Sequence, residues 1–296
     1  MSKSPNPALK RMGLTDSDRV VIIHTDDIGM CQSNVEAFAD LWEAGIISSG
    51  AIMVPCPWSN AALEYAQEHP QADLGVHLTL TSEWQQYRWG PISTRDPRSG
   101  MMDKEGYFFR TSEEVQRKGR QAAVKKELQA QLDRALAAGL KPTHIDTHMG
   151  SVACAKYMNL YLNLAEKSKL PPMIFRMDEE EWRGAGLDAL TAKLAARMIR
   201  GLEEKKVPLL DHLVMLPLET DKDHTELARK TLSDLKPGIT HFIIHPNKDT
   251  PEIRAIAPDW RARVGNYQDF MSDEIRKHIK KIGLHVIGYR ALAELM

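Results

Sequence analysis

An apolar run that ends in two adjacent carboxylates constrains this chain more than any other feature of its sequence. Residues 19–25 read Arg-Val-Val-Ile-Ile-His-Thr, and Asp26, Asp27 and Gly29 follow directly. Such a run is typical of a strand that is buried on both faces. In a regular strand the two carboxylates would point to opposite faces, so that one can bind a cation while its neighbour handles a proton. A solvated turn of the Asp-Asp-x-Gly type is the alternative.

Apolar strands and amphipathic helices alternate along the whole chain. The expected strands span residues 19–28, 46–54, 73–80, 142–148, 173–177, 208–216, 239–246 and 284–289. The expected helices span residues 33–44, 59–68, 115–138, 155–167, 187–205, 225–235 and 267–281, and a short helix closes the chain. Strands that alternate with helices in this way predict β/α repeats around a parallel sheet.

Eight such repeats in 296 residues predict a single α/β domain over residues 1–296, a distorted (β/α) barrel of the TIM type with seven to eight parallel strands. An open doubly wound sheet is the alternative, but the sequence has no GxGxxG or GK[S/T] turn to support it. Residues 82–111 interrupt the alternation with Gly, Pro, Arg and aromatic residues. We expect this segment to be a long insert that governs substrate choice.

Composition narrows the choice of partners. Lys and Arg number 39 and Asp and Glu number 40, so no net field favours nucleic acid or an anionic membrane. Cys31, Cys56 and Cys154 are far apart and lack CxxC spacing, which argues against a disulfide framework or a thiolate zinc site. We expect a soluble, cytoplasmic protein, because no apolar signal segment or run of about 20 apolar residues is present. The sequence leaves open whether it forms a homo-oligomer.

The predicted strand ends are unusually rich in acids and histidines. Barrel enzymes place their sites at the carboxyl ends of the strands. A single histidine in a strand is more often a hydrogen-bonded core residue than a ligand. Several of them converging on one face predict a metal site built from histidines and carboxylates. The candidates along the chain are Asp26, Asp27, His77, His144, Asp146, His148, Arg176, Asp211, His212 and His245.

Spacing selects one ligand from the fourth strand. His144, Asp146 and His148 alternate and share one face, but the two histidines are roughly 13 Å apart at about 3.3 Å per residue, so they cannot bind one ion. His148 is nearest the exit of the strand and is the expected ligand, with Asp146 as its outer partner. Together with Asp27 and His77 it would hold one divalent metal ion and leave positions open for water and substrate. Mixed N/O ligation favours zinc, with magnesium as the alternative.

Four segments resemble one enzyme family, and they occur in the same order. They read Ile-His-Thr-Asp-Asp-Ile-Gly at 23–29, Gly-Val-His-Leu-Thr-Leu at 75–80, Pro-Thr-His-Ile-Asp-Thr-His at 142–148 and Ile-His-Pro at 244–246. The combination is similar to the YdjC-like carbohydrate deacetylases, which include chito-oligosaccharide deacetylases. The resemblance implies a distorted (β/α) barrel and a metal-dependent hydrolase that removes N-acetyl groups from amino sugars or short oligosaccharides. The chain departs from many relatives at residues 149–151, where they have further histidines.

The resemblance also implies a role for each site residue. Asp27, His77 and His148 would be the metal ligands, Asp26 the general base and His245 the general acid. A water molecule activated by the ion would lose a proton to Asp26 and attack the acetamide carbonyl. His245 would then protonate the leaving amine.

Residues for substrate contact are less constrained by the sequence. Arg176 or a backbone N–H could stabilise the oxyanion, and Asp211 is a further candidate for substrate binding. The rings of Trp84 and Trp89 could form a platform for a sugar ring, or they could simply pack over the barrel mouth.

Two other classes of function remain open from the sequence. A metal-dependent phosphoesterase or lyase would use the same Asp and His residues on a different electrophile. A non-catalytic sugar-binding protein would keep the fold, but it needs neither Asp26 nor His245, and the presence of both disfavours it.

Overall fold

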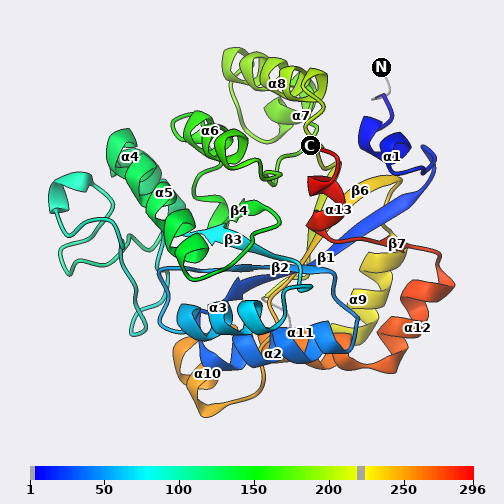
Figure 1. Cartoon of the computed structure of the whole chain (residues 1–296), viewed down its shortest axis with the longest axis horizontal. Helices are drawn as coiled ribbons and strands as arrows, with labels where there is room; N and C mark the ends of the chain where they lie inside the picture. Colours follow the sequence, from blue (N-terminus) through cyan, green and yellow to red (C-terminus); the bar gives the residue numbers. More distant parts are fainter. Residues whose placement is uncertain (1–3, 219–223) are drawn as a thin grey trace.

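The computed structural model describes residues 4–218 and 224–296. Its strands are β1 (Arg19–Ile28), β2 (Ser49–Ile52), β3 (Leu74–Leu78), β4 (Ile145–Thr147), β5 (His212–Met215), β6 (Gly238–Ile244) and β7 (His285–Val286). All pair in parallel in the order β4-β3-β2-β1-β6-β5, and β7 lies beside the start of β1. The sheet curls around an interior and helices flank it (Figure 1). The predicted distorted barrel of parallel strands is therefore confirmed.

Most of the helices lie between successive strands, whereas α1 precedes β1 and α13 follows β7. They are α1 (Pro7–Arg11), α2 (Gln32–Glu43), α3 (Ser59–Glu68), α4 (Ser112–Lys118), α5 (Gln121–Ala137), α6 (Met158–Ser168), α7 (Glu179–Gly184), α8 (Ala189–Glu204), α9 (His224–Ser233), α10 (Pro251–Ile256), α11 (Trp260–Met271), α12 (Asp273–Lys281) and α13 (Tyr289–Ala293). Short 3₁₀ turns occur at η1 (Pro97–Ser99) and η2 (His148–Gly150). α2 packs on β1, α3 on β2 and α5 on β3, while α11 packs against α2 and α9.

Two predicted helices are each broken in two. The helix expected over 115–138 is interrupted at Gly119, whose ψ of 129° is not helical, so that α4 ends before α5 begins. The helix expected over 267–281 is interrupted at Ser272, whose hydroxyl accepts a hydrogen bond from the first turn of α12. In both cases the apolar pattern continues, but the helix ends at a cap residue whose backbone is not helical.

Side chains along β1 alternate between an outer and an inner face. Val21 and Ile23 point outward into the main core beneath the helices. Ile22 points inward and packs with Tyr289 at the start of α13. His24 continues the inner face two residues later, so the interior changes from apolar to polar along the strand. The amino ends of the strands therefore surround an apolar plug, and polar groups occupy the interior toward the carboxyl ends.

β1 is irregular at its two aspartates. Its pairing with β2 shifts register between Thr25 and Ile28, and Asp27 has a left-handed backbone with φ of 65°. A bulge of this kind re-aims the side chains beside it. Asp26 and Asp27 both face His77, whose Nε2 is 3.8 Å from Oδ2 of the first and 3.6 Å from Oδ1 of the second. The expectation that they point to opposite faces is wrong, because it assumed a regular strand.

The seam between β4 and β5 is the least regular part of the barrel. The strand predicted over 173–177 is present only as two isolated parallel bridges, which join Ile145 to Pro172 and Phe175 to Leu210. The segment therefore spans the gap between the two edge strands without forming a ladder of its own. This incomplete closure is what makes the barrel distorted.

A buried ion pair lies beside this seam. The guanidinium of Arg176 is 3.0 Å from Asp211 and 2.6 Å from Glu203, and Asp211 also accepts from the side chain of Asn6 and the backbone N–H of Ile239. Ile239 is the second residue of β6, so the pair lies at the amino ends of the strands. Barrel sites lie at the opposite ends. The structure therefore does not bring Arg176 and Asp211 to the predicted substrate site.

The insert packs its large aromatic rings into the core. Trp84 and Trp89 are 7% and 3% exposed, and their rings meet edge to face with centroids 5.7 Å apart. The indole N–H of Trp89 donates to the backbone oxygen of Thr81 at 2.7 Å. Little of either ring is left to stack on a sugar, so their burial favours the packing alternative.

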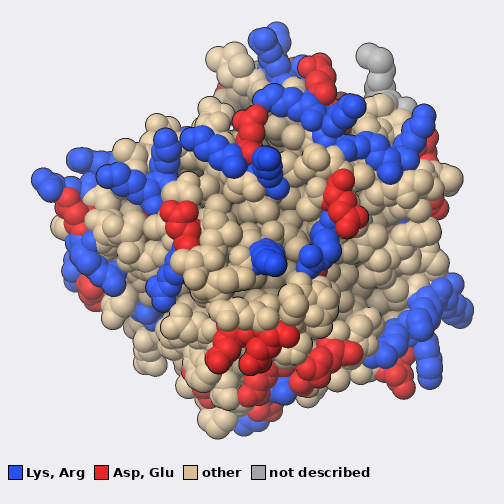
Figure 2. All heavy atoms as spheres, in the orientation of Figure 1, with Lys and Arg blue, Asp and Glu red and all other residues tan. Residues whose placement is uncertain are grey.

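The face shown in Figure 2 carries charges of both signs. Acidic side chains gather at its lower edge, in the region of α2 and α3, and Lys and Arg are spread over the rest of this view. Across the described ranges, no helix is long and apolar enough to cross a membrane. All three cysteines are free thiols.

Replacing Asp211 by Ala should lower the free energy of unfolding by about 3–5 kcal/mol, because the buried guanidinium of Arg176 loses a buried partner. Glu203→Ala is the matched control. It removes a carboxylate from the same guanidinium, but the Glu203 side chain is 25% exposed, so the loss should be about 1 kcal/mol or less. Urea unfolding followed by circular dichroism measures both, and equal losses would contradict a structural role for this ion pair.

Trp89→Ala should lower the free energy of unfolding by about 3–5 kcal/mol, because it leaves a cavity in the core. Tyr107→Ala is the control within the same insert, since that ring is 38% exposed and its loss should change stability by about 0.5 kcal/mol or less. Thermal unfolding compares them. A Trp89→Ala protein of unchanged stability but raised KM would restore the sugar-platform interpretation.

Candidate metal centre and active site

Three side chains from different strands converge at the carboxyl ends of the sheet. Asp27 lies on β1, His77 lies on β3, and His148 follows β4 as the first residue of η2. Oδ1 of Asp27 is 3.6 Å from Nε2 of His77 and 3.1 Å from Nδ1 of His148. One ligand-type atom from each residue lies within 4.8 Å of the others. The structure thus brings together the three residues expected to hold a metal ion, which we call the ligand group.

Each member of the ligand group also contacts a charged partner through the side-chain atom that does not face the other members. The pairs are Asp146 on Nδ1 of His77 at 2.8 Å, Glu83 on Nε2 of His148 at 3.1 Å, and Arg263 on Oδ2 of Asp27 at 2.8 Å. Partners of this kind orient a ligand and decide which imidazole nitrogen carries hydrogen. Nε2 of His77 and Nδ1 of His148 are therefore the nitrogens that face Asp27.

The ligand group fits a divalent cation. Oδ1 of Asp27 and Nε2 of His77 are buried and have no hydrogen-bond partner among the described residues. Buried polar atoms are rarely left unpaired, because each costs about 1–3 kcal/mol. A cation between these atoms and His148 would satisfy both. Two imidazole nitrogens and one carboxylate oxygen are a donor set that suits zinc and leaves positions for water and substrate.

Charged partners outweigh burial throughout the ligand group. Burial would raise the pKa of Asp27, but His148 holds it well below the usual range. Burial would lower the pKa of the two histidines, but Asp146 raises that of His77 to about 9, and Glu83 raises that of His148 to about 10. The surrounding carboxylates thus stabilise positive charge at this point of the barrel.

Asp26 and His245 lie beside the ligand group. Oδ1 of Asp26 is 2.8 Å from Nδ1 of His24. The other oxygen, Oδ2, is 3.8 Å from Nε2 of His77 and 3.9 Å from Nε2 of His245. His245 follows β6, and burial lowers its pKa. Oδ2 of Asp26 is therefore the oxygen that faces both the ligand group and the second histidine.

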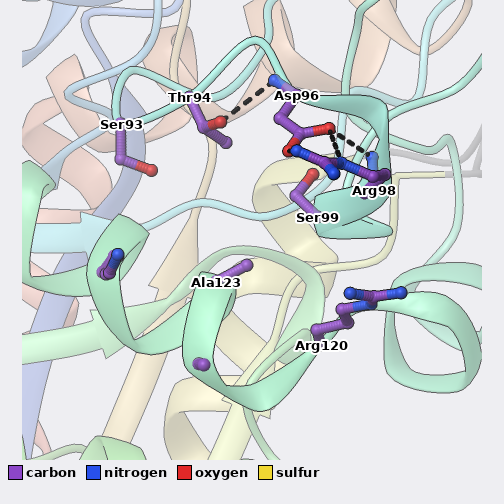
Figure 3. A pocket seen from close by; sticks show the side chains of 9 residues that line it. Ser93, Thr94, Asp96, Arg98, Ser99, Arg120 and Ala123 are labelled. Carbon is purple, nitrogen blue, oxygen red and sulfur yellow. Dashed lines mark hydrogen bonds and ion pairs between the residues drawn. The ribbon is translucent and has the colours of Figure 1, made fainter.

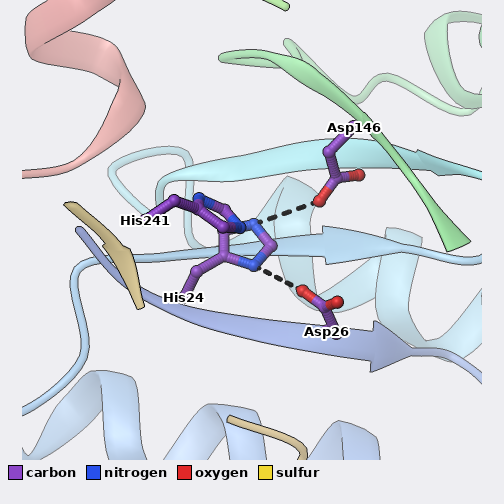
Figure 4. A group of neighbouring side chains, drawn as sticks. All are labelled: His24, Asp26, Asp146 and His241. Atoms are coloured by element: carbon purple, nitrogen blue, oxygen red, sulfur yellow. Dashed lines mark hydrogen bonds and ion pairs between the residues drawn. The ribbon is translucent and has the colours of Figure 1, made fainter. Parts of the chain in front are cut away.

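A second polar layer lies beneath the first. His24, Asp26, Asp146 and His241 offer ligand-type atoms within 4.8 Å of one another, and Figure 4 shows the His24 ring between the two carboxylates. Oδ2 of Asp146 and Nε2 of His241 have no hydrogen-bond partner among the described residues. His24, however, lies between the two carboxylates, and both of its nitrogens have partners, Nδ1 in Asp26 and Nε2 in His144 at 3.0 Å. We therefore interpret this layer as a hydrogen-bonded network rather than as a second metal site.

The two tryptophans predicted for substrate contact stand behind the ligand group. The ring centroid of Trp89 is 6.3 Å from that of His148, and the ring of Trp84 lies 5.4 Å from the guanidinium carbon of Arg263. They therefore form an apolar wall beside His148 and Arg263.

Four residues of these two layers were not predicted. His24 stands two positions before Asp26 on the same face of β1, a signal that the motif already contained. His241 lies in an apolar strand with no special neighbour. Glu83 belongs to the aperiodic insert, and Arg263 is 236 positions from its partner in the ligand group. No local pattern links either of the last two to the site.

A surface hollow near the insert does not belong to this site. It lies against the start of α5, and the residues around it include Ser93, Thr94, Ser99 and Arg120 (Figure 3). None of the ligand group lines it. The chemistry-bearing residues are therefore gathered at the barrel ends and not in this hollow.

Two carbohydrate deacetylases are similar to this chain over most of its length. A carbohydrate deacetylase of Thermus thermophilus is 32% identical over 288 residues, which cover 97% of this chain and 98% of that protein. A carbohydrate deacetylase of Thermoanaerobacter pseudethanolicus is 23% identical over 233 residues, covering 73% and 91%. A solved structure from Enterococcus faecalis, of a protein proposed to cleave cellobiose phosphate, superposes with a TM-score of 0.76 at 22% identity over 93% of this chain and 99% of that one. That likeness shows a shared fold.

A family model described as YdjC-like protein matches residues 20–281. This range includes the ligand group, its three charged partners, Asp26 and His245. Because the match spans most of the chain and agrees with a relative 32% identical over nearly its whole length, the chain belongs to the YdjC-like protein family.

Proposed function

We propose that this protein is a carbohydrate deacetylase that uses a divalent metal ion to remove acetyl groups from N-acetylated amino sugars or short oligosaccharides. The observation that carries the proposal is the ligand group with Asp26 and His245 beside it. A cation site with open positions, a base and an acid around one point is the arrangement that metal-assisted hydrolysis needs. Relatives named carbohydrate deacetylase support an acetylated sugar as the substrate.

We assign to Asp26 the role of accepting a proton from the attacking water. Its Oδ1 is held by His24, and its Oδ2 faces the ligand group. Burial would raise the pKa of Asp26, but His77 and His24 outweigh it and lower the pKa. The carboxylate is therefore ionised in the resting protein and can act as a general base.

We assign to His245 the role of giving a proton to the leaving amine. Its backbone N–H donates to Asn266 at 2.9 Å. Its Nε2 is 3.9 Å from Oδ2 of Asp26. Burial lowers the pKa of His245 and favours the neutral ring between turnovers. The proton that it donates must therefore arrive within the cycle, and Oδ2 of Asp26, 3.9 Å away, is where the proton of the water arrives.

Asp27, His77 and His148 would hold the metal ion, with their charged partners orienting them. When bound, a divalent metal ion lowers the pKa of water and polarises the acetamide carbonyl. Zinc suits this mixture of nitrogen and oxygen, and magnesium is the alternative. We also propose that the insert over 82–111 shapes the substrate site, because its Glu83 contacts His148. A cytoplasmic location stays a prediction from the sequence, which leaves open whether the protein forms a homo-oligomer.

Acetate release tests the proposed function directly. The purified protein should release acetate from N-acetylglucosamine or its short oligomers, EDTA should abolish the release, and added zinc or magnesium should restore it. Phosphate release from sugar phosphates, measured in parallel, is the control for the phosphoesterase alternative. Phosphate without acetate would replace the proposal with that alternative, and acetate release that survives EDTA would remove the metal from it.

Paired substitutions separate the roles of the two aspartates. Asp26→Asn should keep the metal and lower kcat by about 10²–10⁴-fold, because Asn cannot accept the proton. Asp27→Asn should instead lower metal content, and excess metal should restore part of the rate. His212→Ala, at a partly exposed position on β5, is the control for general effects of substitution. Metal analysis and acetate release decide the roles, and metal loss in Asp26→Asn with retention in Asp27→Asn would reverse them.

A further inference from the structure

Besides its contact with the proposed base Asp26, the fully buried ring of His24 contacts other polar groups of the interior. Its Nδ1 is 2.8 Å from Oδ1 of Asp26. Its Nε2 is 3.0 Å from Nε2 of His144 and 3.5 Å from Oδ2 of Asp146. The ring thus joins two carboxylates, as Figure 4 shows, and contacts a further histidine in the same interior.

The contacts continue from His144 to a carboxylate at the start of β3. Oγ1 of Thr143 is 3.0 Å from Nδ1 of His144 and donates to Asp73 at 2.7 Å. Asp73 also accepts from the hydroxyl of Ser49 and the backbone N–H of Arg290. Because the single hydroxyl hydrogen of Thr143 goes to Asp73, its oxygen can only accept from His144. Nδ1 of His144 therefore carries hydrogen.

The remaining hydrogens of the network can then be placed one by one. Burial holds the pKa of His144 well below its usual range, so this ring is neutral and, with hydrogen on Nδ1, its Nε2 is bare. Nε2 of His24 must therefore donate to it, since two bare nitrogens would repel at that distance. The other nitrogen of His24, Nδ1, is 2.8 Å from a carboxylate oxygen of Asp26, and such an oxygen accepts. His24 accordingly donates from both nitrogens.

The interior is shaped around this network. A β-carbon on Gly75 would lie 2.4 Å from the ring of His144, and one on Gly288 would lie 2.2 Å from Oδ2 of Asp73. Tyr289 stacks on the other face of the network, with its ring centroid 3.8 Å from that of His144. A larger residue at Gly75 would displace His144, and one at Gly288 would displace Asp73. The two glycines therefore leave the room that these two side chains occupy.

We propose that His24 is the positioning residue for Asp26: its Nδ1–H binds Oδ1, so that Oδ2 is the oxygen that takes the proton of the attacking water. The proposal rests on the proposed function. Without this hydrogen bond the carboxylate can rotate, and the oxygen that faces His77 and His245 is no longer held in place. A loss of this kind lowers kcat more than it raises KM, because it affects proton transfer rather than sugar binding.

Two substitutions of His24 form a matched test. The amide nitrogen of Asn takes the place of Nδ1 and that of Gln the place of Nε2, so only His24→Asn keeps a donor for Asp26. We expect His24→Asn to retain kcat within about tenfold of wild type and His24→Gln to lower it by about 10²–10³-fold, with KM and metal content unchanged in both. Equal kcat values in the two variants, or metal loss that accompanies the lower kcat, would overturn the proposal, since a merely structural histidine does not distinguish them.

The ring nitrogens of His24 offer a readout that is independent of activity. In the full-length protein labelled with ¹⁵N-histidine, the His24 signals, assigned by their absence from His24→Asn, should show hydrogen on both nitrogens. A bare Nδ1 would overturn the proposal. If the wild-type protein releases no acetate, the proposed function fails, whereas this spectrum still decides how His24 is hydrogen-bonded to Asp26.

Discussion

The break in β1 at Asp27 is the constraint on which the rest of the site depends. A left-handed backbone at a residue other than glycine costs of order 1–3 kcal/mol and persists only where its surroundings enforce it. Here the guanidinium of Arg263, buried and bound also to Asp259, holds Oδ2 of Asp27. The break places Asp26 and Asp27 on the same side of the strand. One imidazole, that of His77, can therefore lie close to both carboxylates, which brings the proposed base and the proposed ligand to one point.

The interior changes in polarity along the strands, from an apolar cluster to a hydrogen-bonded network and then to the ligand group. At the amino ends an apolar plug lies beside the ion pair of Arg176 with Asp211. In the middle, both nitrogens of His24 are hydrogen-bonded, to Asp26 and to His144, within a low-dielectric interior. The unpaired atoms of Asp27 and His77 lie at the exit, where a cation can compensate them. The apolar cluster and the structural ion pair thus lie at the amino ends of the strands, and the ligand group lies at their carboxyl ends.

Much of the fold was predictable because it follows from short-range periodicity. The helix expected over 59–68 has those bounds in the structure, and the alternation of strands and helices correctly indicated a parallel barrel. Periodicity failed where one residue overrides it. Gly119 and Ser272 end helices within continuous apolar patterns, and the strand expected over 173–177 is reduced to isolated bridges. In each case the deciding factor is a backbone turn or an edge contact that hydrophobic spacing does not encode.

By itself, the sequence determined which residues stand at the carboxyl ends of the strands, and therefore that Asp27, His77 and His148 come together, because parallel strands present their ends at one edge of a sheet. Only the tertiary structure decided what holds them. Glu83 comes from an aperiodic insert and Arg263 from a helix 236 positions away, so neither contact leaves a local signal. Periodicity determines the face on which a side chain lies, whereas the atoms it meets depend on the packing of segments that are distant in the chain.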